Sequence, residues 1–169
     1  MELVNRVANS GLITINLEEY FPQREILHFD LKDYLWKEFI LKEKDFRIAL
    51  KEHDWTQYSD KIVLVYCSND AIIPVWAYML VTSYASKTAA DVYGMTEEEF
   101  LKAHYRKAVE QMDLNDFEGK RIVIKGCSDK PVPASAYLDI QSKLTDFAQS
   151  VMYGEPCSTV PIFKKPRKV

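Results

Sequence analysis

Residues 61–78, KIVLVYCSNDAIIPVWAY, contain the pattern that decides the fold. The run of β-branched residues at 61–67 predicts a strand that is buried on both faces. Pro74 then predicts the start of a helix that runs to about residue 86, because the first helical position needs no N–H donor. The segment is therefore expected to form a strand, a polar turn and a helix.

The same pattern returns at residues 121–137, RIVIKGCSDKPVPASAY. Both copies have Cys-Ser after an apolar run, and both contain the spacing D-x3-P-x2-A-Y. Each copy closes on a short segment, VYG at 92–94 and MYG at 152–154. A match that spans strand, turn, helix and second strand indicates an internal duplication of a βαβ unit.

The order of predicted elements indicates a single α/β domain over residues 1–169. Parallel neighbouring strands need crossover helices, so we expect a three-layer fold with a mainly parallel sheet built from two similar βαβ units. The first strands of the two units are expected to lie side by side, in an order such as 2-1-3-4. The predicted parts are an N-terminal β/α extension at 1–53, βαβ units at 54–94 and 113–154, a connecting helix at 95–112 and a C-terminal tail at 155–169.

Three cysteines are the candidate functional residues. Cys67 and Cys127 are expected at the carboxyl ends of adjacent strands, where open α/β sheets bind ligands. Cys157, in GEPCSTVP, follows the last strand of the second unit and is expected to join them. Three thiolates suit zinc, or alternatively an iron–sulfur cluster, and leave one position open for water or substrate. His53 is the first candidate for a fourth ligand, and the alternatives are Asp70, Asp129 and Glu155.

Two other interpretations of the cysteines remain open. In the first, one cysteine of low pKa is the nucleophile of a metal-free thiol or redox enzyme. In the second, the protein is a non-catalytic interaction module and the cysteines are structural, because a reduced cysteine packs as a small apolar residue. Ser68 with Asp70, and Ser128 with Asp129, are expected to cap the helices that follow.

The composition limits the partners and the compartment. The formal net charge of −3 argues against a nucleic-acid partner, which needs a basic surface. No apolar run is long enough for a membrane helix, and the N-terminus lacks the pattern of a secretory signal. We therefore expect a cytoplasmic protein whose partner is a small molecule or another protein. An odd number of cysteines in that compartment also argues against structural disulfides.

Several motifs along the whole chain resemble one known family. They are VNRVANSGLITINLEEY, FILKEKDFR, HDWTQYSDK, CSNDAIIPVWAYML, KGCSDKPVPASAY and MYGEPCSTVPIFKK. Together they are similar to the uncharacterised domain-of-unknown-function family 2480 of Bacteroidetes. The resemblance implies a bacterial cytoplasmic protein, and it assigns no activity and no functional residue.

Overall fold

The computed structural model describes residues 11–126 and 128–166, and the chain divides into two compact units. The inner unit is Pro22–Phe100. The outer unit combines both ends of the chain, Met1–Phe21 and Leu101–Val169. The inner unit is thus one continuous segment, inserted in the sequence between the two segments of the outer unit.

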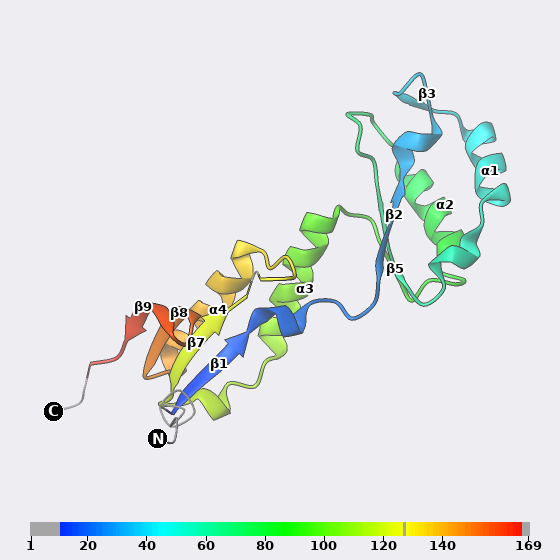
Figure 1. Cartoon of the computed structure of the whole chain (residues 1–169). Coiled ribbons are helices and arrows are strands. Elements are labelled where there is room, and N and C mark those ends of the chain that lie inside the picture. Colours follow the sequence, from blue (N-terminus) through cyan, green and yellow to red (C-terminus); the bar gives the residue numbers. More distant parts are fainter. Residues whose placement is uncertain (1–10, 127, 167–169) are drawn as a thin grey trace. The chain divides into compact units, whose positions relative to one another are not determined.

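The inner unit has a three-stranded parallel sheet with the order β2-β5-β6. Its strands are β2 (Ile26–Asp30), β5 (Ile62–Tyr66) and β6 (Asp91–Tyr93). Helices α1 (Glu43–Glu52) and α2 (Val75–Ala85) connect them and lie on the same side of β2 and β5 (Figure 1). The buried core between this sheet face and the two helices consists of Phe29, Leu31, Phe46, Leu50, Tyr58, Val63, Val65, Ala77 and Val81.

The first residues of helix α3 (Glu97–Gln111), up to Phe100, belong to the inner unit and contact the other face of this sheet. Glu97 forms an ion pair with His28 of β2 at 3.1 Å, and the ring of Phe100 lies 5.1 Å from that of Tyr93 of β6. This helix start is capped, because the Thr96 N–H donates to the Glu99 carboxylate at 2.8 Å. A small antiparallel hairpin, β3 (Leu35–Trp36) with β4 (Ile40–Leu41), completes the inner unit.

The outer unit has a four-stranded sheet with the order β1-β7-β8-β9. Strands β1 (Leu12–Asn16), β7 (Arg121–Lys125) and β8 (Ser150–Glu155) are parallel, and β9 (Ser158–Lys164) is antiparallel to β8. Helix α4 (Ala134–Phe147) connects β7 to β8 and lies beside α3. The two helices are joined by an ion pair between Arg106 and Asp139 at 3.4 Å. The Lys143 ammonium also donates to the Val109 carbonyl at 2.7 Å, so α3 and α4 form one layer.

The N-terminal segment supplies the first strand of each unit. Strand β1 leads into a 3-10 turn at Leu17–Tyr20, and β2 leads into a 3-10 turn at Leu31–Tyr34. The two sequences, LITINLEEY and ILHFDLKDY, match in their pattern, with a polar cap residue before a leucine that is fully buried in both. The duplicated unit is therefore one strand longer than the sequence pattern at 54–94 and 113–154 predicts.

The mainly parallel α/β architecture and the two βαβ segments are confirmed. The expected pairing of the first strands is wrong, because β5 pairs with β2 and β6, whereas β7 pairs with β1 and β8. Strands β2 and β1 of the N-terminal segment lie beside β5 and β7, at the positions that a direct pairing of β5 with β7 would need. The segment 155–169, predicted as a tail, contributes β9 to the outer sheet.

The predicted helix caps are also wrong. Helices α2 and α4 begin at Val75 and Ala134, and Pro74 and Pro133 precede them without a side-chain cap. Ser68 and Ser128 precede these helices by several residues, so their side chains lie too far along the chain to cap the first turn.

Candidate functional site

The loop after β5 is held by a carboxylate from the neighbouring strand. The Asp30 Oδ1 atom accepts hydrogen bonds from the backbone N–H groups of Lys32 and Ser68, both at 3.0 Å. Partial burial raises the pKa of Asp30, but the hydrogen bonds from Ser68 and Lys32 outweigh it, so the net pKa lies below the usual range. The carboxylate is therefore ionised at neutral pH and fixes the carboxyl end of the inner sheet.

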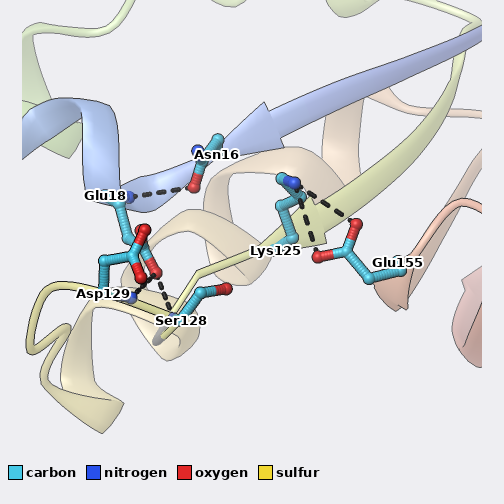
Figure 2. Close-up of polar contacts among 6 residues, drawn as sticks. All are labelled: Asn16, Glu18, Lys125, Ser128, Asp129 and Glu155. Atoms are coloured by element: carbon cyan, nitrogen blue, oxygen red, sulfur yellow. Dashed lines mark hydrogen bonds and ion pairs between the residues drawn. The ribbon is translucent and has the colours of Figure 1, made fainter.

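The outer unit has the same arrangement with a different side chain (Figure 2). The Glu18 carboxylate accepts hydrogen bonds from the backbone N–H groups of Ser128 and Asp129. Asn16, which corresponds to Asp30, likewise caps its own turn by accepting from the Glu18 N–H at 3.2 Å, while Glu18 supplies the contact to the loop. In both units, backbone donors after the central strand bind a carboxylate of the same chain.

Two further contacts fix the carboxyl edge of the outer sheet. The Lys125 ammonium and the Glu155 carboxylate form an ion pair at 3.2 Å, which joins the ends of β7 and β8 (Figure 2). Gly126 lies against helix α4, because a Cβ atom there would be 2.7 Å from the Tyr137 hydroxyl oxygen. Only a glycine fits this approach without a shift of Tyr137.

The structure describes two of the three cysteines of the predicted site, and they belong to different units. Cys67 is half-buried and packs against the core of the inner unit, whereas Cys157 is exposed in the turn between β8 and β9 of the outer unit. Cys127 lies outside the described residues. Within residues 11–126 and 128–166, no group of three His, Cys, Asp or Glu side chains could hold a metal ion. Binding of zinc or an iron–sulfur cluster by these cysteines stays a prediction.

His53, the predicted fourth ligand, lies in an aromatic cluster of the inner unit. Its Nδ1 atom is 3.3 Å from the Tyr34 hydroxyl, and its Nε2 atom is 3.2 Å from the Tyr58 hydroxyl. Desolvation lowers the pKa of His53 although the Asp54 charge raises it, and burial raises the pKa of Tyr58 to about 12. The ring is thus a neutral imidazole held by two neutral hydroxyls, and a metal ion would have to displace one of them. Its role as a ligand stays a prediction.

The outer unit carries an apolar groove, which we call the α4 groove, between α4 and the strands β8 and β9. Its volume is about 590 Å³. Two polar side chains, Gln141 and Ser142, lie among its lining residues. The rest of the lining is apolar or aromatic and consists of Ile124, Ala134, Tyr137, Leu138, Tyr153 and Ile162.

The walls of the α4 groove combine exposed aliphatic side chains with a pair of tyrosine rings. Leu138 is 68% exposed and Ile162 is 52% exposed, although both are large and apolar. The rings of Tyr137 and Tyr153 meet edge to face at 5.7 Å. Ile124 and Tyr153 are paired residues near the carboxyl ends of β7 and β8, so the groove opens at the sheet edge where α/β proteins bind ligands.

The sequence prediction missed the α4 groove because its residues come from four elements. The strand pair Ile124 and Tyr153 follows from the duplication, but Ile162 lies in β9, which the sequence did not predict. The equivalence of Leu138 to Met79 was the available signal, since both follow the tyrosine of the repeated A-Y and both are exposed.

These features define a mainly parallel α/β protein made of two similar units, each with an edge of backbone donors and one with an apolar groove. The chain belongs to the DUF2480 family, described as proteins of unknown function, whose family model matches residues 1–165. No curated protein and no solved structure matches the sequence. In the described part of the chain, every helix is too short or too polar to cross a membrane.

Proposed function

We propose that this protein binds a small, uncharged molecule with an apolar, ring-shaped body in the α4 groove. The observation that carries the proposal is the apolar lining of this groove at the carboxyl edge of a parallel sheet. Its volume of about 590 Å³ lies within the range of small-molecule sites, which are mostly apolar with a few polar groups.

The lining favours binding over catalysis. Among the described residues that line the groove, the ionisable groups are the hydroxyls of Tyr137 and Tyr153. General acid–base and nucleophilic reactions at neutral pH use groups such as histidine, carboxylate or thiolate. The two tyrosine rings instead offer flat apolar walls with a polar tip, which suits the stacking of a ring against them.

The exposure of Leu138 supports an occupant for the groove. Burying a leucine side chain is worth about 1.5–3 kcal/mol, so a ligand that covers Leu138 and Ile162 gains free energy from apolar area that water now contacts. Gln141 and Ser142 can then give orientation through one or two hydrogen bonds.

Nile red, a neutral aromatic dye that fluoresces in apolar surroundings, tests the proposal with a matched pair of variants. Leu138→Asp places a charge in the groove wall and should weaken dye binding at least tenfold, because covering an unpaired carboxylate costs more than about 1.4 kcal/mol. Met79→Asp is the control, because Met79 holds the equivalent position in α2 of the inner unit and is equally exposed, at 68%.

Two results would contradict the proposal. Equal loss of dye binding in both variants would mean that the dye recognises exposed apolar residues in general. Unchanged binding in Leu138→Asp would place the dye elsewhere.

A further inference from the structure

A second groove of the outer unit lies on the opposite sheet face and differs in charge. The strand register aligns Arg121 of β7, Ser150 of β8 and Lys164 of β9 in one row across the sheet. Paired residues of neighbouring strands point to the same face, so both cations lie on the face of Ser150 and Met152. Phe163 pairs with Val151, but it stands next to a register shift in the pairing of β8 with β9 and also lines the groove. Ile122 and Val151 point to the other face.

The groove, which we call the cationic groove, has a volume of about 660 Å³. Its apolar lining comes from Met152, Pro161 and Phe163, and its charged residues are Arg121 and Lys164. Among the described residues, those that line it include no carboxylate. Two positive charges therefore stand beside an apolar surface in a chain whose formal net charge is −3.

Several other cations of the outer unit form contacts within the protein. Lys125 pairs with Glu155, Arg106 pairs with Asp139, and Lys143 donates to carbonyl groups at the end of α3. For Arg121 and Lys164, by contrast, the described residues provide no ion pair or side-chain hydrogen bond. Their charges are available to a ligand.

We propose that the cationic groove binds an amphiphilic anion, a free molecule with a carboxylate or phosphate head and an apolar body. The head would lie between Arg121 and Lys164, where a guanidinium can bind an anion with two parallel hydrogen bonds. The body would cover Met152, Pro161 and Phe163. An inorganic anion leaves the apolar part uncovered, and a neutral lipid leaves both charges without a partner.

The edge strand itself argues against an added peptide strand as the occupant. Pro161 lies in the middle of β9 and has no N–H to donate, and proline in an edge strand blocks the pairing of a further strand. The ligand is therefore expected to lie on the sheet face and not along the free edge of β9.

Isothermal titration of the full chain with sodium decanoate, below its micelle concentration and at low salt, tests this proposal. Decanoate should bind, and both acetate and the neutral decanamide should bind at least tenfold more weakly. Arg121→Gln combined with Lys164→Gln should weaken decanoate binding about 4- to 25-fold, since each exposed ion pair contributes roughly two- to fivefold. Arg121→Lys, which keeps the charge, should retain most of the affinity.

The matched control is Lys51→Gln, which removes one exposed cation from α1 of the inner unit. It should leave decanoate binding unchanged. Binding of decanamide as strong as that of decanoate, or an unchanged affinity in the double variant, would overturn the proposal. Sedimentation with phosphatidylglycerol vesicles without binding of free decanoate would overturn it as well, because the ligand would then be a membrane surface.

Discussion

The carboxylate of Asp30 lies 3.0 Å from the backbone nitrogen of Ser68, and the two residues are 38 positions apart in the chain. This hydrogen bond joins the carboxyl end of the edge strand β2 to the loop that follows the central strand β5. Glu18 makes the corresponding contact with Ser128 and Asp129 in the outer unit. The duplicated architecture thus keeps one interaction, a carboxylate on backbone donors, while the residue that supplies it differs.

Replacing Asp30 should destabilise the inner unit. Asp30→Ala leaves the Lys32 and Ser68 N–H groups without their acceptor, and the loss of such a cap costs about 1–2 kcal/mol. All three tryptophans, at positions 36, 55 and 76, belong to the inner unit, so urea unfolding followed by tryptophan fluorescence reports on it. Asp33→Ala removes a nearby exposed carboxylate and should change the midpoint little. Equal midpoints for the two variants would contradict the assigned role of Asp30.

Glu18→Ala should have its effect in the outer unit. The change removes the acceptor of the Ser128 and Asp129 N–H groups, which should then exchange their hydrogens faster with deuterium. Mass spectrometry of peptides from the loop after β7 measures this, with Glu19→Ala as the control because Glu19 is exposed. The tryptophan signal of the inner unit should stay as in the parent protein. Unchanged exchange in the loop would show that Glu18 does not hold it.

The sequence predicts the elements better than it predicts their partners. The run IVLV in β5 and the run IVI in β7 identify buried strands, because only strands of a covered parallel sheet are apolar on both faces. Such runs do not specify which strand lies beside them. The matching segments LITINLEEY and ILHFDLKDY carried the missing information, since a strand before each repeat provides each central strand with its own neighbour.

The candidate sites were less predictable than the strands. The α4 groove and the cationic groove both need residues of β9, a strand interrupted by Pro161 in a segment that resembles a tail. The sequence shows that Leu138 follows a spacing that is repeated within the chain, but only the fold shows that water contacts its side chain. The same holds for Arg121, because the strand register decides which side chains lie beside it, and none of the described ones forms an ion pair with it.

Gly126 should be sensitive to a single added methyl group. A Cβ atom at this position would lie 2.7 Å from the Tyr137 hydroxyl oxygen, so Gly126→Ala should cost about 1–3 kcal/mol through overpacking. In a Tyr137→Phe background the oxygen is absent and the added cost should be smaller. A double-mutant cycle of thermal unfolding, followed by circular dichroism, measures the difference. Additive effects of the two changes would contradict this contact.

The stability of the inner unit should fall as the pH decreases through the range in which His53 titrates. Burial lowers the pKa of His53 below its ordinary value of 6.5, so the unfolded chain takes up a proton at a higher pH than the folded chain does. The contribution of His53 to the free energy of unfolding is fully present above about pH 6.5 and decreases as the pH falls through the folded-state pKa. Urea midpoints from tryptophan fluorescence at pH 7.5 and 5.5 measure this loss.

The His53→Gln variant serves as the reference for that measurement. Glutamine does not titrate, whereas His28 and His104 are present in both proteins, so the difference between the two pH profiles isolates His53. The profile of the variant should be flatter than that of the parent. Parallel profiles would mean that His53 does not contribute to the pH dependence.

The cysteine hypothesis predicts a bound metal in protein purified without added metal. Elemental analysis should find zinc, or iron if the site holds a cluster, in a fixed ratio to the chain, and Cys157→Ser should lose it because three ligands are the minimum for a tight site. Cys157 is exposed in a hairpin turn, so the serine variant should fold and keep the tryptophan midpoint of the parent. Absence of metal, together with rapid labelling of one thiol by iodoacetamide, would favour a reactive cysteine, whereas three slowly labelled thiols would favour a structural role. In both cases the absence of metal is what excludes the metal site, because a chain that holds zinc or a cluster carries the metal in a fixed ratio.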